Sequence, residues 1–177
     1  MRLAILSTAA VLTAGTAFAE TRSFDIADFT RVDAGAGLNV EIAEGDQFLI
    51  EAEGAKAGID RLVVERRGDT LKLSQKERNW LSGLSPIMDF FRDDEVAKVR
   101  VVLPSLAGVA VHSGADVLVS GASAASFEGS VSSGADLNIT GVSAAQVSLE
   151  SSGGSVELWG VDQVDANVSS GGEVRRH

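Results

Sequence analysis

The sequence predicts an all-β protein built as a solenoid, a stack of similar strand-and-corner units. A short phrase recurs at a nearly constant interval, the residues between its copies alternate between polar and apolar, and glycines stand where the chain would turn. A fixed period of about 20 residues is typical of repeat architectures, in which each unit stacks on its neighbour. The pattern therefore indicates architecture first, and function has to be argued separately.

The recurring phrase is a Ser-Gly pair followed by a strand. It begins at Ser113 and Ser133, and it returns in looser form at Ser152 and Ser170, at intervals of 20, 19 and 18 residues. The alternating runs between the pairs, such as Asp136–Thr140, are too short for helices and indicate strands with one buried face. Glycine suits corners because it reaches positive φ without a Cβ clash. A second corner glycine follows each run, at Gly121, Gly141 and Gly160.

If the repeats stack in parallel, equivalent inward residues form ladders along the stack. We expect three such ladders: Val117, Leu137, Val156 and Val174; Val119, Ile139 and Leu158; and Val111, Val131, Leu149 and Val168. The third repeat has one extra residue between Leu149 and Val156 in this alignment. A bulge at that corner would absorb it and keep the inward set inward.

The first 19 residues resemble a bacterial export signal. Arg2 supplies the positive start, Leu3–Leu12 the apolar core, and Ala17–Ala19 the small-residue cleavage site. A membrane anchor is the alternative, but the apolar run is short for a bilayer span. We expect cleavage before Glu20, a single domain over residues 20–177 with no stable membrane span, and a periplasmic or secreted location.

Residues 29–103 predict a further β region ahead of the repeats at 104–174. Alternation around Leu38–Ile42 and Phe48–Ala52, with a turn between them, predicts a hairpin. Further strands are expected at Ile59–Glu65, at Thr70–Leu73 and at Val99–Leu103. A degenerate forerunner of the Ser-Gly corner is expected within Asp33–Gly37.

An aromatic insert at residues 75–98 breaks the alternation. Its apolar residues recur at helical spacing, while Pro86 limits any helix to one or two turns. One interpretation is a cap over an end or edge of the solenoid. The other is an exposed contact surface for a partner, formed by Trp80, Leu84, Met88, Phe90 and Phe91.

The order of these features resembles a known family. Phe29–Val32, Val40–Ile42, the turn Glu44–Asp46, the run Val99–Leu106 and the repeated Ser-Gly-x-Asp corners follow one another as in the bacterial putative auto-transporter adhesin head domain, the GIN domain. The resemblance covers roughly Phe29 to Val174. It implies a right-handed parallel β-helix-like fold with an antiparallel β region at its start, and an exported protein. It implies no catalytic residues.

Charge and composition exclude several classes of function. The formal net charge is −10, which disfavours nucleic acid or an anionic membrane surface as a partner. The chain has no cysteine and two histidines, so an ordinary zinc site is not expected. Nucleophile-elbow and phosphate-loop motifs are missing. We therefore expect no catalytic residue and no cofactor, and we interpret His112 as an exposed strand residue.

Asp116 and Asp136 are the only candidate metal ligands. Stacked in register, they would lie about 5 Å apart, and calcium takes oxygen ligands of this kind. The alternative is that each aspartate bonds the backbone of its own corner. The sequence leaves both interpretations open.

These observations predict an exported, non-catalytic binding or scaffolding domain, adhesin-like or envelope-associated. The partner would be a protein or a glycan, and a second copy of the chain is a further candidate. The alternative is a carbohydrate-binding or carbohydrate-active β-helix protein. Hydrolysis would need two carboxylates at a set separation, and the acidic run Asp93–Glu95 is better explained as a solvated flank of the insert.

Overall fold

The computed structural model describes residues 20–76, 96–143, 146–161 and 164–177. Over these residues the chain is almost entirely β, with two sheets and one short helix, α1 (Lys56–Arg61). In spatial order, the eight-stranded sheet contains β1 (Glu20–Ser23), β4 (Leu49–Gly54), β7 (Lys98–Leu103), β3 (Asn39–Glu44), β9 (Asp116–Ala122), β11 (Asp136–Val142), β13 (Ser155–Trp159) and β15 (Glu173–Arg176). The seven-stranded sheet contains β14 (Asp165–Ser169), β12 (Gln146–Ser152), β10 (Ser126–Ser132), β8 (Gly108–Val111), β2 (Arg31–Ala34), β6 (Thr70–Gln75) and β5 (Leu62–Arg67).

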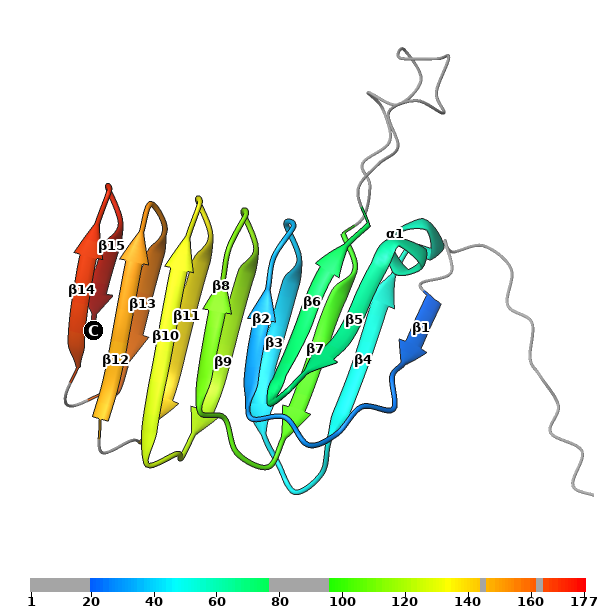
Figure 1. Ribbon diagram of the computed structural model, residues 1–177, viewed down its shortest axis with the longest axis horizontal. Coiled ribbons are helices and arrows are strands. Elements are labelled where there is room, and N and C mark those ends of the chain that lie inside the picture. Colours follow the sequence, from blue (N-terminus) through cyan, green and yellow to red (C-terminus); the bar gives the residue numbers. More distant parts are fainter. Residues whose placement is uncertain (1–19, 77–95, 144–145, 162–163) are drawn as a thin grey trace, which may run out of the picture.

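From β8 onward the chain alternates between the two sheets. Each strand pairs in parallel with the strand one repeat later in its own sheet. Figure 1 shows the two strands of each repeat lying one behind the other, joined by corners that line up along one side of the molecule. The predicted all-β class is confirmed, in the form of two mixed sheets that do not close on each other.

Inward-facing apolar residues from both sheets form one core. The first two predicted ladders are present: Leu137 lies opposite Val117 and Val156, and Val156 lies opposite Val174. Ile139 likewise lies opposite Val119 and Leu158. Apart from Val174, which is half-buried, these side chains are buried, because period-two alternation places every second residue between the sheets.

The third predicted ladder is wrong at its third position. Val131 lies opposite Val111 and Ser151, and Ser151 lies opposite Val168. Leu149 still faces inward, but in the next row, opposite Gly129. A Cβ on Gly129 would lie 2.5 Å from Leu149 Cδ2, so the glycine makes room for the leucine.

The reason is that the third corner is one residue shorter than its neighbours, not longer. Five positions separate Ser151 from Val156, against six between Val131 and Leu137. Ser151 is buried, and its hydroxyl donates a hydrogen bond to the carbonyl oxygen of Gly154 at 2.7 Å. The expected bulge is therefore replaced by a tighter corner that a buried serine holds.

The other corners share one backbone conformation. Both residues of Ser113-Gly114, Ser133-Gly134 and Ser170-Gly171 have positive φ. Ala36-Gly37 has the same conformation between β2 and β3, so the predicted forerunner of the corner is confirmed. A non-glycine residue adopts positive φ at a cost, which indicates that stacking of the repeats holds the corner in place.

The antiparallel region lies at the end of the stack opposite β14 and β15 (Figure 1). The hairpin predicted from β3 and β4 is wrong, because β7 lies between them, parallel to β3 and antiparallel to β4. Ile59 belongs to α1 and not to a strand, and β5 and β6 form the antiparallel pair that follows it. The strand predicted at Val99–Leu103 is confirmed as β7, Lys98–Leu103.

In the part of the chain that the structure describes, no helix is long and apolar enough to cross a membrane. The aromatic insert falls on residues 77–95 for the most part, which lie outside the described residues. Its interpretation as a cap or a contact surface therefore stays a prediction.

Candidate functional site

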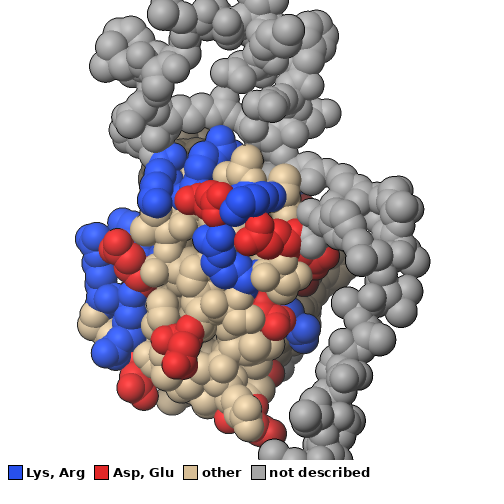
Figure 2. Space-filling view, turned by 90° about the vertical axis from the view of Figure 1, so that its right-hand side faces the viewer, with Lys and Arg blue, Asp and Glu red and all other residues tan. Residues whose placement is uncertain are grey.

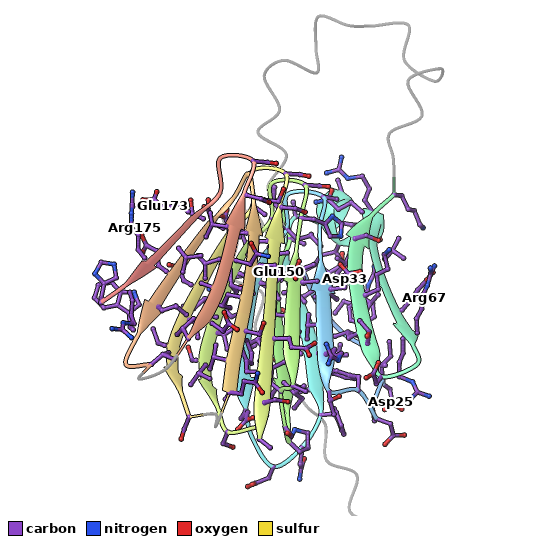
Figure 3. The ribbon with its side chains drawn as sticks, turned by 60° about the vertical axis from the view of Figure 1, so that its left-hand side comes forward. Asp25, Asp33, Arg67, Glu150, Glu173 and Arg175 are labelled. Carbon is purple, nitrogen blue, oxygen red and sulfur yellow. The ribbon has the colours of Figure 1, made fainter. Side chains whose placement is uncertain are left out.

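A groove of about 450 Å³ lies on the outer face of the seven-stranded sheet. It crosses β6, β2, β8, β10 and β12, and its size is within the range typical of ligand sites. Its polar lining comes from Arg31, Asp33, Thr70, Glu128, Ser130, Ser148 and Glu150. Figure 3 labels Asp33 and Glu150, which mark its two sides on this sheet.

Small residues on β8 create the groove. Gly108 and Ala110 occupy the outward positions of β8, between Arg31 and Asp33 on β2 and the outward residues of β10. Side chains alternate across a strand, so the long polar side chains of β2 and β10 project outward on either side of β8, where the outward residues are only glycine and alanine. A Cβ on Gly108 would lie 2.9 Å from the carbonyl oxygen of Glu128 and 3.1 Å from Arg31 Nη1.

An ion pair spans the floor. Arg31 Nη1 lies 2.8 Å from Glu128 Oε2, and the two residues come from β2 and β10, on either side of β8. Arg31 Nε also lies 3.6 Å from Asp69 Oδ2 in the turn between β5 and β6. Arg31 is thus held between two carboxylates while its side chain stays about 39% exposed.

A second polar cluster borders the groove at Asp33. Asp33 Oδ1 lies 2.9 Å from His112 Nε2, and Asp33 Oδ2 lies 4.0 Å from Lys72 Nζ. The other ring nitrogen of His112 lies 3.1 Å from Ser113 Oγ. His112 follows β8 and is half-buried, which corrects its prediction as an exposed strand residue. A Cβ on Gly35 would lie 2.2 Å from His112 Cε1, so this glycine allows the ring to reach Asp33.

The contact between Ser113, His112 and Asp33 is a consequence of the corner. Ser133 and Ser170 have the same positive φ as Ser113, and each follows a serine where Ser113 follows His112. The unusual backbone of Ser113 is therefore a property of the repeat and does not indicate a nucleophile.

Asp116 and Asp136 lie opposite each other on β9 and β11, as the repeat predicts. Burial raises the pKa of Asp116, and the neighbouring charge of Asp136 and a hydrogen bond between the two carboxyls raise this pKa further. Lys98 lines the same small hollow as Asp116, and its ammonium forms an ion pair with Glu41. The described residues contain no group of three or more metal-ligating side chains, and calcium binding at this pair stays a prediction.

Sequence reasoning did not identify the groove. Its charged residues occupy outward strand positions, where polar residues are ordinary, and the pairing of strands distant in sequence brings them together. The available signal was Gly108 and Ala110, two small residues at consecutive outward positions of one strand. The predicted contact surface, Trp80, Leu84, Met88, Phe90 and Phe91, lies outside the described residues.

Comparison with protein families decides the relationship. Residues 28–177 match the family described as putative auto-transporter adhesin, head GIN domain. The chain belongs to this family. The resemblance predicted from the sequence is thereby confirmed. No match was found among curated proteins.

Solved structures share the fold of this GIN domain. A putative adhesin from Bacteroides fragilis is 15% identical, with a TM-score of 0.54, and the match covers 92% of this chain and 98% of that one. A putative adhesin from Parabacteroides distasonis is 12% identical, with a TM-score of 0.58, over 88% and 72% of the two chains. A protein from the same organism, titled a putative lipid binding protein, is 16% identical, with a TM-score of 0.52, over 88% and 80%.

Proposed function

We propose that this GIN domain is an exported, non-catalytic binding domain, adhesin-like or envelope-associated, and that the groove on the seven-stranded sheet is its contact site. The groove itself carries the proposal: a hollow of about 450 Å³ with polar walls, whose floor at Gly108 and Ala110 carries no long side chain and is crossed by the Arg31–Glu128 ion pair. Membership of an adhesin family supports a binding function. We also propose that the alternating repeats form a right-handed β-solenoid of one domain, 20–177, exported by cleavage after Ala19.

The lining favours a carbohydrate as the ligand. Hydroxyls of Thr70, Ser130 and Ser148 can donate and accept hydrogen bonds, while carboxylates accept and the Arg31 guanidinium donates. A sugar presents hydroxyls that can satisfy all three kinds of group. The groove lining contains three carboxylates, from Asp33, Glu128 and Glu150, and one guanidinium, from Arg31, so neutral or amino sugars fit the groove better than acidic ones.

The test compares two charge-neutral double variants on an array of bacterial and host oligosaccharides. Arg31→Gln with Glu128→Gln removes the ion pair that spans the groove. Glu41→Gln with Lys98→Gln removes an ion pair on the opposite sheet and serves as the matched control. We expect the wild type and the control to bind the same glycans and the groove variant to lose them, without cleavage products. Loss in the control alone, or no glycan bound by the wild type, would overturn the proposal.

A further inference from the structure

The last repeat leaves an unpaired edge in both sheets, and each edge strand carries one valine among mostly polar and charged residues. β14 and β15 are the outermost strands at this end, and among the described residues no strand pairs with their outer edges. Val168 on β14 lies opposite the buried Ser151 and so occupies an inward position, yet its side chain is 46% exposed. Val174 on β15 lies opposite the buried Val156 and is itself half-buried. An open edge with exposed apolar side chains recruits another strand.

The opposite end of the stack is protected. There α1 contacts β1 and β4, and a network of ion pairs joins the helix to β1: Arg22 with Glu20 and Asp60, and Lys56 with Glu20 and Asp60. Figure 2 views this end and shows positive and negative side chains interspersed over it. A head-to-tail stack would have to bury this network, whereas a tail-to-tail contact leaves it in solvent.

We propose that two copies of this chain associate tail to tail, with β15 pairing antiparallel to β15 and β14 antiparallel to β14 about one two-fold axis. The axis runs perpendicular to both sheets, which is the one direction that maps each sheet onto its own continuation. In antiparallel strands, directly opposed residues point to the same face of the sheet. This axis keeps every side chain on its own face, so one residue of β15 must lie opposite its own copy, with the axis between the two.

Charge selects the register. If the axis passes Glu173 or Arg175, two like charges lie directly opposite each other, which is destabilising. If it passes Val174, the two Val174 side chains meet inside, and Glu173 of each copy lies opposite Arg175 of the other. Arg176, whose register partner Leu158 faces inward, then lies opposite Gly172 at the end of the paired segment, where glycine leaves room for the arginine side chain to reach solvent. The sequence of β15 is therefore self-complementary in one register.

The same axis places the two grooves on one side of the pair. Because the axis is perpendicular to the sheets, the two seven-stranded sheets become one, and their outer faces point the same way. If the groove binds as proposed, the dimer is bivalent, and linking two sites raises apparent affinity for a repetitive surface. The dimer itself does not depend on the proposed ligand.

The first test is charge exchange, read by light scattering over a concentration series of the purified protein. Glu173→Arg and Arg175→Glu each place like charges opposite one another, and each should raise the apparent dissociation constant of the dimer about tenfold. The double exchange restores opposite charges and should restore the dimer. The matched control is Glu65→Arg on β5, an edge strand at the other end, where Glu65 and Arg67 lie 3.0 Å apart, just as Glu173 and Arg175 lie 2.8 Å apart within one copy. It should leave the dimer unchanged.

The second test fixes the register by a disulfide. The chain has no cysteine, so Val174→Cys can only cross-link two copies. Directly opposed residues of antiparallel strands have Cα atoms about 4.5–5.5 Å apart, within reach of a disulfide. We expect Val174→Cys to form covalent dimers under mild oxidation and Val64→Cys on β5 to remain uncross-linked. A wild-type monomer at every concentration, or a dimer that Val174→Cys does not cross-link, would overturn the proposal.

Discussion

Arg31 and Glu128 meet across β8: Arg31 Nη1 lies 2.8 Å from Glu128 Oε2, although 97 positions separate the two residues in the chain. The pair ties β2 to β10 above the bare backbone of Gly108. It is half-exposed, so its contribution to stability is small, about 0–1 kcal/mol. Its importance is for the shape and charge of the groove.

Filling the groove floor should abolish glycan binding and lower the free energy of unfolding only moderately. In Gly108→Ala the new Cβ would lie 2.9 Å from the backbone carbonyl oxygen of Glu128 and 3.1 Å from Arg31 Nη1, so both the β10 backbone and the Arg31 side chain must shift. We expect loss of glycan binding and a decrease in the free energy of unfolding of about 1 kcal/mol, measured by urea denaturation. Unchanged binding in a folded Gly108→Ala protein would place the site elsewhere.

Glu44 should stabilise the fold in a pH-dependent way. Burial acts to raise the pKa of Glu44, but hydrogen bonds from the hydroxyl and backbone of Ser123 and from the backbone of Leu106 outweigh it, and the pKa is lowered. A lowered carboxyl pKa contributes stability above the unfolded-state pKa, and this contribution is lost as the pH falls through the folded-state pKa.

We therefore expect Glu44→Gln to lower the free energy of unfolding by about 1 kcal/mol at neutral pH. The difference from the wild type should shrink as the pH falls below the ordinary glutamate range. Urea denaturation at a series of pH values measures it, with Glu53→Gln on the exposed face of β4 as the control. A difference that does not change with pH would show that packing and not charge accounts for the effect.

The Asp116–Asp136 pair should make the free energy of unfolding depend on pH in the opposite direction from Glu44. The pKa of Asp116 is raised, so the folded state binds this proton more tightly than the unfolded state. Stability is then lost as the pH rises between the two pKa values. We expect Asp116→Asn to raise the free energy of unfolding at neutral pH by about 0.5 kcal/mol, with the gain vanishing in acid.

Calcium provides a separate test of the same pair. We expect the melting temperature of the wild type to stay constant when calcium is added, because the described residues around the pair offer no third metal-ligating side chain. A rise in the melting temperature that Asp116→Asn abolishes would instead identify the two aspartates as calcium ligands.

The repeat pattern predicted much of the core. Strict alternation placed Val117, Leu137 and Val156 in one ladder, because a one-residue slip would turn every side chain outward. The Ser-Gly pairs located the corners, because positive φ restricts residue choice. These features depend on neighbours in the sequence, so the sequence alone was enough to predict them.

Other features depend on contacts between distant segments. The insertion of β7 between β3 and β4 is decided by sheet pairing across more than 40 positions, and the hairpin signal at Glu44–Asp46 is equally compatible with it. Ser151 fills an inward position that alternation would give to an apolar residue, because its hydroxyl has a partner in Gly154. The groove arises from five strands that only the fold brings together.

Ser151, which takes the third position of the third ladder, gives a further prediction. An apolar residue at Ser151 would complete the row of Val111, Val131 and Val168, yet we expect Ser151→Val to destabilise the protein. A Cβ on Gly172 would already lie 2.4 Å from Ser151 Oγ, so added methyl groups meet the last corner, and the bond to Gly154 is lost. We expect a cost of about 1–3 kcal/mol by urea denaturation, with Ser151→Ala losing less. A stabilised Ser151→Val protein would contradict the described corner.

The most direct test of the groove as the binding site is an amide NMR titration of the protein with the oligosaccharide that it binds most tightly on the array. We expect the largest shift changes to fall on β2, β8 and β10, centred on Gly108 and Ser130, and we expect the Arg31→Gln, Glu128→Gln double variant to abolish them. Shift changes confined to the eight-stranded sheet or to residues 77–95, with β8 unaffected, would contradict it.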